Sequence, residues 1–347
     1  MIYSVGNPHR AGYMGYNATK QWEKLTLLIK GVLCMKRIFV TGGAGFIGSH
    51  LAEHLVGQGY DVVVYDNLTT GRKENLEGIK HTFLDGDIRD YDHLHASLKH
   101  SDIVFHLAAL TSVAQSMENM DDYISVNVQG TVNVLKAAKA AGAHKVLYAS
   151  SATVYGDSQI LPKQEDMRLE PLSPYAITKL DGEYYCNVYR QFLGLKTVCT
   201  RFFNVFGEKQ DPNSPYAAAI PIFISRALRN DRIGIYGDGT QTRDFIYVKD
   251  LVNAMIFLME KGEGVFNLGY GRTISVGSLV NMITHLTNSW SEVAYVPERA
   301  GEIKHSYASV EKLSRLGFSP AYSFESGLQR ALSYYRGNNA GKMELPH

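Results

Sequence analysis

Residues 38–48, Ile-Phe-Val-Thr-Gly-Gly-Ala-Gly-Phe-Ile-Gly, combine a short apolar run with three glycines at regular spacing. The apolar run is typical of a buried strand, and Gly42, Gly45 and Gly48 separate it from apolar residues at helical spacing over 49–55. Glycine allows the positive φ of a tight turn and lets the backbone approach a phosphate closely. The first turn of the following helix offers free N–H groups to a pyrophosphate. This context favours a dinucleotide-binding turn over an ordinary strand–helix loop.

The bulk composition excludes several classes of protein. The chain has 347 residues, which suits one α/β unit with a subsidiary lobe. Its net charge of +1 gives no indication of a nucleic-acid or membrane partner. The three cysteines, Cys34, Cys186 and Cys199, show no metal-binding spacing and predict a reduced, cytoplasmic protein without a metal site. No stretch is long enough for a membrane span, and Leu25–Ile29 is too short for a signal-peptide core.

Strand and helix patterns alternate after the glycine turn. The predicted strands are 61–65, 81–84, 102–107, 145–149, 197–207 and 245–248, and the predicted helices include 123–140, 219–228 and 249–261. The alternation breaks after residue 207, and we found no repeat or flexible linker. We therefore expect an α/β fold: a doubly wound parallel sheet of the Rossmann type with a smaller, interleaved C-terminal lobe.

An acidic residue ends the second predicted strand. Asp66 follows 61–65, where a dinucleotide fold places a carboxylate on the adenosine ribose diol. A carboxylate repels a 2′-phosphate, so the residue favours NAD over NADP. Arg72 and Lys73 nearby keep NADP open, and Asp66 could also be a simple turn residue.

A tyrosine and a lysine share one face of a predicted helix. Ser173 suits the N-cap and Pro174 the first helical position, which places Tyr175 and Lys179 one turn apart. An ammonium group beside a phenol favours the phenolate and lowers its pKa, as a tyrosine acting as a base near neutral pH requires. A surface helix face is the alternative interpretation.

Two serines follow the strand predicted at 145–149. The carboxyl ends of parallel strands border the ligand crevice, so Ser150 and Ser151 are candidates to hold a substrate hydroxyl, with turn chemistry as the alternative. A second Tyr-x-x-x-Lys, Tyr16 to Lys20, precedes the glycine turn and has no serine nearby. We interpret it as non-catalytic.

Two polar residues lie in otherwise apolar segments. His106 lies in the predicted strand 102–107, and we interpret it as a packed core histidine rather than a catalyst. Asn127 lies inside the predicted helix 123–140, and a polar residue there is usually solvated or capping.

The chain resembles the extended short-chain dehydrogenase/reductases and, within them, the nucleotide-sugar 4-epimerases, over roughly residues 36–335. The motifs that carry the resemblance are Thr41–Gly48, Asp66–Leu68, Gly86–Ile88, His106–Ala109, Ser150–Gly156, Tyr175–Lys179 and Arg201–Gly207. The resemblance implies an N-terminal extension at 1–34, an NAD-binding Rossmann domain at 35–207 with part of about 240–268, and a mainly substrate-binding lobe at 208–347. A homodimer through a four-helix contact is usual for such proteins.

The resemblance also implies the residues that bind NAD. Their positions are Gly42, Gly45, Phe46 and Ile47 under the pyrophosphate, Asp66 and Asn67 on the adenosine ribose, Asp87 and Ile88 at the adenine edge, Ala108 and Ala109 beside the nicotinamide half, and Asn127 in the supporting helix. Tyr175 and Lys179 match the catalytic base and its helper, which also contact the cofactor, and Ser151 matches the catalytic serine.

The implied substrate is a UDP-sugar. The implied ligands are Asn204, Arg243 and Arg299 for the diphosphate, Glu302 for the uridine ribose, Ser151 for the sugar hydroxyl, and Ser306 beside C2 of the sugar. Forked guanidinium donors match phosphate oxygens, which suits two arginines on a diphosphate. Ser306, with 210–213 and 216–219, is similar to epimerases that accept N-acetylhexosamines.

The resemblance implies inversion at C4 of a UDP-hexose through transient oxidation to a 4-keto sugar. Dehydratases of this family carry Asp-Glu after the catalytic residue and UDP-glucuronate decarboxylases carry a glutamate there, whereas this chain has Ala152 and Thr153. The pair argues against a 4,6-dehydratase or a UDP-glucuronate decarboxylase or epimerase, which remain the first alternative. A non-catalytic NAD-binding regulator is the second alternative, although Ser151, Tyr175 and Lys179 are all present.

Overall fold

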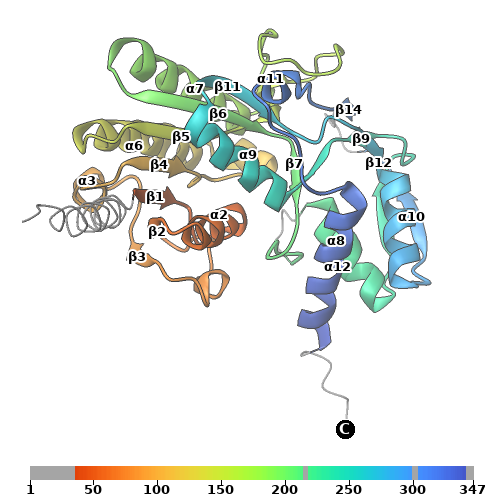
Figure 1. Cartoon of the computed structure of the whole chain (residues 1–347). Coiled ribbons are helices and arrows are strands. Elements are labelled where there is room, and N and C mark those ends of the chain that lie inside the picture. Colours follow the sequence, from red (N-terminus) through yellow and green to blue (C-terminus); the bar gives the residue numbers. More distant parts are fainter. Residues whose placement is uncertain (1–35, 214–217, 299–303, 341–347) are drawn as a thin grey trace, which may run out of the picture.

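A seven-stranded parallel sheet forms the centre of the computed structural model, which describes residues 36–213, 218–298 and 304–340, with side chains up to 337. The sheet order is β11-β6-β5-β4-β1-β2-β3, which confirms the predicted Rossmann-type sheet (Figure 1). The strands are β1 Arg37–Thr41, β2 Asp61–Asp66, β3 Thr82–Asp85, β4 Ile103–His106, β5 Lys145–Ser151, β6 Lys196–Phe202 and β11 Gly264–Leu268. The segment 1–34, the pair Tyr16 and Lys20, and the predicted ligands Arg299 and Glu302 lie outside the described residues.

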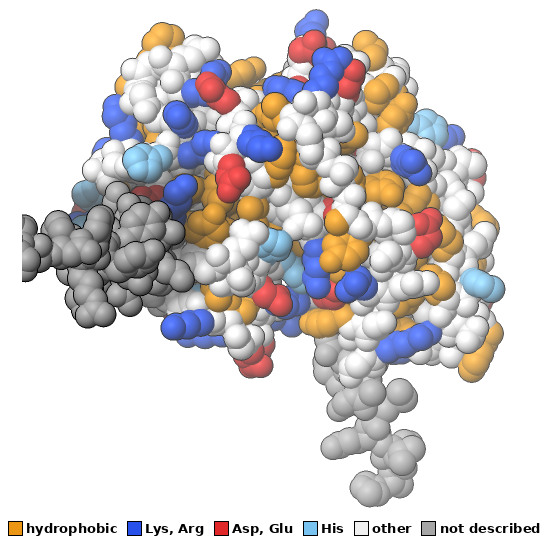
Figure 2. Space-filling view, in the orientation of Figure 1, with side chains coloured by type: hydrophobic (Ala, Val, Ile, Leu, Met, Phe, Trp, Pro, Cys, Tyr) orange, Lys and Arg blue, Asp and Glu red, His pale blue; other side chains and the backbone are white. Residues whose placement is uncertain are grey.

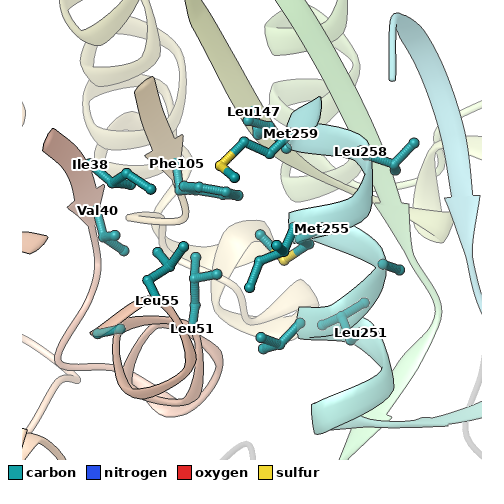
Figure 3. Close-up of a cluster of buried hydrophobic side chains, with 14 of the residues drawn as sticks. Ile38, Val40, Leu51, Leu55, Phe105, Leu147, Leu251, Met255, Leu258 and Met259 are labelled. Carbon is teal, nitrogen blue, oxygen red and sulfur yellow. The ribbon is translucent and has the colours of Figure 1, made fainter. Parts of the chain in front are cut away.

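Helices cover both faces of this sheet. On one face, α2 Phe46–Gly57 and α9 Val248–Lys261 pack together over β1, β4 and β5, and Figure 3 shows their leucines and methionines meeting Ile38, Val40 and Phe105. On the other face, α3 Tyr91–Ser97, α6 Gly130–Ala140 and α7 Pro174–Phe192 pack around Phe39. Neighbouring residues of β1 therefore enter different cores, as expected for a parallel sheet buried on both sides.

Part of the C-terminal half of the chain belongs to the central sheet rather than to the lobe. Strand β11 pairs in parallel with β6, and α9 precedes it against α2. The two halves are thus interleaved, as the sequence predicts.

The described part of the lobe is built from small sheets and the helices α8, α10 and α12 (Figure 1). Its strands are β7 Asn204–Phe206 with β10 Phe245–Tyr247, β8 Ile233–Tyr236 with β13 Val293–Val296, and β9 Thr242–Arg243 between β12 Ile274–Ser275 and β14 His305–Ser306. Its helices are α8 Ala219–Arg229, α10 Val276–Thr287 and α12 Phe324–Ala340, whereas α11 Glu311–Arg315 packs on the central sheet through Leu313. Buried residues of α8, α10 and α12 share one core with β8 and β10.

Two predicted elements are divided in the structure. The segment expected over 197–207 as a strand and its exit is β6 up to Phe202, and the exit then pairs as β7 with β10. The helix expected over 123–140 consists of α5 Met120–Tyr123, a π-helical segment at Ile124–Gln129 and α6. A π-segment inside a helix often marks a functional site.

The surface shows no single dominant charge. Figure 2 shows lysine and arginine side chains mixed with aspartate and glutamate over the visible face, in keeping with the net charge of +1. Across the parts of the chain that the structure describes, no helix is both long and apolar enough to span a membrane.

Candidate active site

The glycine turn joins β1 to α2. Gly42 has φ +71°, and a Cβ on it would lie 2.7 Å from the Ala108 backbone nitrogen. A Cβ on Gly48 would lie 2.2 Å from the Gly42 carbonyl oxygen. Helix α2 starts after Gly45 without a side-chain cap, so no side chain competes for its first N–H groups. Phe46 and Ile47 form its first turn, which leaves a close, N–H-rich approach for a pyrophosphate.

Asp66 faces this turn from the end of β2. The carboxylate is 7% exposed and accepts the Ala44 N–H at 2.9 Å and the Leu68 N–H at 2.8 Å. Burial raises the pKa of Asp66, and these two hydrogen bonds oppose the rise. Each oxygen keeps further lone pairs for a ribose diol.

The two cations that favoured NADP are engaged elsewhere. Arg72 forms an ion pair with Asp211, and the Lys73 ammonium lies 5.0 Å from the centre of the Phe83 ring. Together with Asp66, this arrangement fits NAD rather than a 2′-phosphorylated cofactor.

The residues predicted at the adenine edge follow β3. Asp87 accepts hydrogen bonds from Arg89 and, at 3.1 Å, from Asn67, and these bonds lower the pKa of Asp87 to about 2. Asn67 is exposed, whereas Ile88 is buried against Gly130.

A buried polar chain supports the end of β4. His106 is 2% exposed, and its ring nitrogens lie 2.8 Å from the Thr41 hydroxyl and 2.9 Å from the Thr131 hydroxyl. Burial, with the Lys179 charge as a smaller cause, lowers the pKa of His106 to about 3. His106 is thus a neutral packed histidine, as interpreted from the sequence.

Asn127 joins the exit of β4 to the helix that carries Tyr175. Its side chain accepts the Leu110 N–H and donates to the Leu110 carbonyl, both at 2.9 Å, and donates to the Thr178 hydroxyl at 3.1 Å. Asn127 is therefore neither solvated nor capping, which corrects the general expectation for a polar residue in a helix. The hydrogen bonds of Asn127 hold the backbone just after the half-buried Ala108 and Ala109.

Ser151, Tyr175 and Lys179 meet at the carboxyl end of β5. Ser151 is the last residue of β5, and α7 begins as predicted, with the Ser173 side chain accepting the Ala176 N–H and Pro174 in the first turn. The Ser151 hydroxyl lies near the Tyr175 phenol and favours its ionised form. The Lys179 ammonium lies 5.9 Å from the centre of the Tyr175 ring and donates to the Ala149 carbonyl at 2.9 Å.

The sequence predicts a lowered pKa for the Tyr175 phenol, and the structure corrects this expectation. Burial raises the pKa of Tyr175 to about 12, and the neighbouring Ser151 hydroxyl opposes the rise. Burial also lowers the pKa of Lys179 to about 8. Burial is the largest cause of both shifts, since the two side chains are almost fully buried.

The predicted substrate ligands lie on the lobe side of β5 and β6. Ser151 is in register with Phe202, and Asn204 begins β7 just beyond, with its side chain donating to the Asp244 carbonyl at 3.1 Å. Arg243 and Ser306 are direct partners in the β9–β14 pair. The Arg243 guanidinium donates to the Lys304 carbonyl at 3.2 Å. The structure thus brings Arg243 and Ser306 together across about sixty residues of sequence.

Sequence reasoning missed three supporting residues. The Thr153 hydroxyl donates to the Ser151 hydroxyl at 2.9 Å from the 3₁₀ turn η3, Ala152–Tyr155. Asp244 is fully buried and accepts three backbone N–H groups. Glu183 lies one helical turn beyond Lys179 and is hydrogen-bonded to Ser150. Only Glu183 had a sequence signal, since Tyr175, Lys179 and Glu183 recur every four residues.

Comparisons with known proteins agree with this geometry. Residues 38–269 match the NAD dependent epimerase/dehydratase family. The chain is 38% identical over 304 residues to a putative UDP-glucose 4-epimerase of Methanocaldococcus jannaschii, covering 87% of this chain and 99% of that protein. It is also 38% identical over 317 residues to a UDP-N-acetyl-alpha-D-glucosaminuronate decarboxylase of Bacillus cytotoxicus, covering 87% of this chain and 98% of that protein.

A solved structure shares both the fold and much of the sequence. The UDP-N-acetylglucosamine 4-epimerase of Methanobrevibacter ruminantium M1, in complex with UDP-N-acetylmuramic acid, superposes with a TM-score of 0.84 at 39% identity, over 87% of this chain and 99% of that one. The chain therefore belongs to the NAD dependent epimerase/dehydratase family, within the extended short-chain dehydrogenase/reductases, and NAD is its cofactor.

Proposed function

We propose that this protein inverts C4 of a UDP-hexose, interconverting UDP-glucose and UDP-galactose and also the corresponding N-acetylhexosamines. The observation that carries the proposal is the approach of Ser151 to the Tyr175 phenol, with Lys179 one turn away and no carboxylate in the turn Ala152–Tyr155. Such a set can move a proton at a sugar hydroxyl but offers no acid–base pair there for C5.

Tyr175 takes the proton of the sugar 4-hydroxyl in this proposal, and Ser151 hydrogen-bonds the same oxygen. A phenol with a pKa of about 12 needs a further positive charge, in addition to Lys179, to ionise near neutral pH, and the nicotinamide ring of NAD would supply it. When bound, NAD supplies a positive ring and a reversible acceptor for the C4 hydrogen with its electron pair, so no net oxidation results. Tyr175 returns the proton after the hexose presents its other face.

The substrate-side residues would hold the nucleotide during this turn. Asn204 and Arg243 would bind the diphosphate together with Arg299, and Glu302 would bind the uridine ribose. The pairing of Arg243 with Ser306 supports a site in which the sugar lies near both the cation and a small side chain. A small residue there leaves room for an N-acetyl group.

A decarboxylase or dehydratase is the second candidate, because the Bacillus cytotoxicus decarboxylase is as similar in sequence as the archaeal putative epimerase. Ala152 and Thr153 oppose it, since neither side chain can abstract a proton from C5. In the structure, Thr153 instead donates its hydroxyl to Ser151.

A substrate panel tests the proposal. Purified protein is incubated separately with UDP-glucose, UDP-N-acetylglucosamine and UDP-glucuronate, and products are resolved by chromatography and mass. We expect the C4 epimers of the first two sugars at unchanged mass and without added reductant. Loss of water or CO2 would establish the second candidate, and a requirement for stoichiometric NAD would contradict epimerisation.

We propose a homodimer formed by α7 and the neighbouring α4, Val113–Glu118. Both helices expose large apolar side chains, namely Val113, Met117, Ile177, Tyr184, Tyr185, Val188 and Phe192. A contiguous apolar face of this kind usually marks an interface. Val188→Glu should give a monomer in sedimentation experiments, whereas Trp290→Glu, at an exposed aromatic residue of the lobe, should not. An unchanged sedimentation coefficient for Val188→Glu would exclude this interface.

Two further assignments remain proposals. Residues 35–207, with part of about 240–268, form the NAD-binding domain, and 208–347 mainly bind substrate. We also propose a cytoplasmic location, which the buried free thiols of Cys186 and Cys199 support. Fractionation of the producing cells, with a cytoplasmic marker enzyme as control, would test the location.

A further inference from the structure

A buried ion pair lies behind the proposed catalytic residues. Arg201 donates two hydrogen bonds to the Glu183 carboxylate, at 2.9 and 2.7 Å, and the two side chains are 3% and 5% exposed. A buried ion pair is weak evidence for stability, because desolvation of the charges offsets much of their attraction. Its position therefore calls for another explanation.

Glu183 connects the pair to the residue before Ser151. Tyr175, Lys179 and Glu183 occupy successive turns of α7 and share one face. The Lys179 ammonium donates to the Ala149 carbonyl at 2.9 Å, and the Ser150 hydroxyl donates to the Glu183 carboxylate at 2.5 Å. The end of β5 is thus held by the same helix face that presents Tyr175.

Arg201 connects the pair to the turn after Ser151. Arg201 lies on β6 in register with Ser150, and its guanidinium donates to the Tyr155 hydroxyl at 2.9 Å. Tyr155 is the last residue of the turn that follows Ser151, and its hydroxyl donates to the Asn267 side chain at 2.6 Å. Ser151 is therefore bracketed by two hydroxyl contacts that converge on one ion pair.

We infer that Glu183 and Arg201 are positioning residues that fix the place of Ser151 beside Tyr175. Neither residue needs to touch the substrate, because Ser150 and Tyr155 transmit their position to the serine between them. A small displacement of a reacting group can lower a rate by about 10²-fold. The kinetic consequence rests on the proposed function, whereas the effect on the phenol does not.

Two conservative variants test the inference while leaving the ion pair intact. Ser150→Ala removes the contact to Glu183, and Tyr155→Phe removes the contact to Arg201. We expect each to lower kcat for the C4 epimerisation by about 10-fold, with KM and bound NAD unchanged. Thr197→Val is the matched control, since it removes another buried hydroxyl contact to α7, with the Cys186 carbonyl, away from Ser151.

A second measurement distinguishes positioning from general loosening of the core. The Ser151 hydroxyl lowers the Tyr175 pKa, so a displacement of this hydroxyl should raise the pKa of the phenol. The groups that face Tyr175 are Ser151, Lys179, Tyr123 and Tyr148, and the two variants leave all four in place. The Tyr175 pKa is obtained from tyrosinate absorbance against pH, as the difference between each NAD-loaded protein and the same protein carrying Tyr175→Phe.

Each outcome then decides the inference. A lower kcat and a higher Tyr175 pKa in both variants, with neither change in Thr197→Val, would support it. Parent-like values of kcat and of the Tyr175 pKa in Ser150→Ala and Tyr155→Phe would overturn it. If the parent protein converts none of the UDP-sugars, the proposed function fails, and the pKa shift alone decides whether the ion pair positions Ser151.

Discussion

The residues of the cofactor side end neighbouring strands of one parallel sheet, whereas those of the substrate side belong to short strands of separate small sheets. On the cofactor side, Gly42 follows β1, Asp66 ends β2 and Ala108 lies just after β4. On the substrate side, Asn204 and Arg243 lie in different sheets. A parallel sheet places its carboxyl ends along one edge by its own geometry, so the cofactor side needs few extra contacts.

The residue Asp244 links the separate segments of the substrate side. Its carboxylate accepts the N–H groups of Tyr270, Gly271 and Ala308, and its carbonyl accepts the Asn204 side chain. Burial raises the pKa of Asp244 to about 6. One buried carboxylate thus joins the segments of Asn204, Arg243 and Ser306. Because the cofactor side is part of the central sheet, we expect substitutions there to affect both NAD binding and folding. Substitutions on the substrate side should affect substrate binding alone.

The largest effect is expected where the two sides meet. Tyr175→Phe should lower kcat by about 10²–10⁴-fold, because it removes the proton-transferring hydroxyl. Bound NAD, measured after denaturation, should remain at the parent level. Tyr189→Phe, on the same helix, is the control and should keep its activity. A Tyr175→Phe protein as active as the parent would refute the catalytic assignment.

The next effect tests the cofactor side. Gly48→Ala should abolish NAD retention and lower the free energy of unfolding by about 1–3 kcal/mol, because the new Cβ would lie 2.2 Å from the Gly42 carbonyl. Gly57→Ala is a matched substitution in the same helix, and its Cβ would meet no atom within 4 Å. NAD content and urea unfolding are measured for both. Equal behaviour of the two variants would show that the close approach at Gly48 is unimportant.

A smaller effect tests the substrate side. Arg243→Ala should raise KM for the UDP-sugar by about 10–100-fold, the loss expected for charge-assisted hydrogen bonds to a phosphate, and leave bound NAD unchanged. Arg232→Ala, an exposed arginine of the lobe paired with Glu292, is the control and should retain the parent KM. Loss of bound NAD from the Arg243→Ala protein would contradict the expectation that the substrate side does not affect NAD binding.

The smallest expected effect is on the pH dependence of the free energy of unfolding, through a buried histidine of the cofactor side. His106 has a folded pKa of about 3 against its ordinary 6.5, so the unfolded chain binds a proton that the native protein excludes between these values. Stability from this group is complete above pH 6.5 and is lost as the pH falls. From pH 7 to pH 5 the loss should be about 2 kcal/mol in urea unfolding.

Two variants isolate this contribution. His106→Gln should show a drop in stability that is smaller than the parent's by that amount, because glutamine does not titrate. His144→Gln, at an exposed histidine, should keep the full drop. An identical pH dependence in the parent and His106→Gln would assign the effect to other groups.

Much of the fold and of the cofactor side was predictable because its signals are local. The apolar strands, the three glycines, the Ser173–Pro174 helix start and the Tyr175–Lys179 spacing are each contained in a few residues. The burial of Asn127 was missed, because a π-segment and its contacts with Leu110 and Thr178 leave no local pattern. The direction of the Tyr175 pKa was wrong for a related reason, since desolvation depends on everything packed around the phenol.

The sequence by itself determined the parallel sheet, the glycine turn and the residue types of the site, because hydrophobic periodicity and turn chemistry act over short stretches of chain. Only the tertiary structure decided which distant residues meet: Arg243 with Ser306 through strand pairing, and Ser151 between the contacts of Glu183 and Arg201. Contacts of this kind depend on strand register and burial, and both are properties of the complete fold.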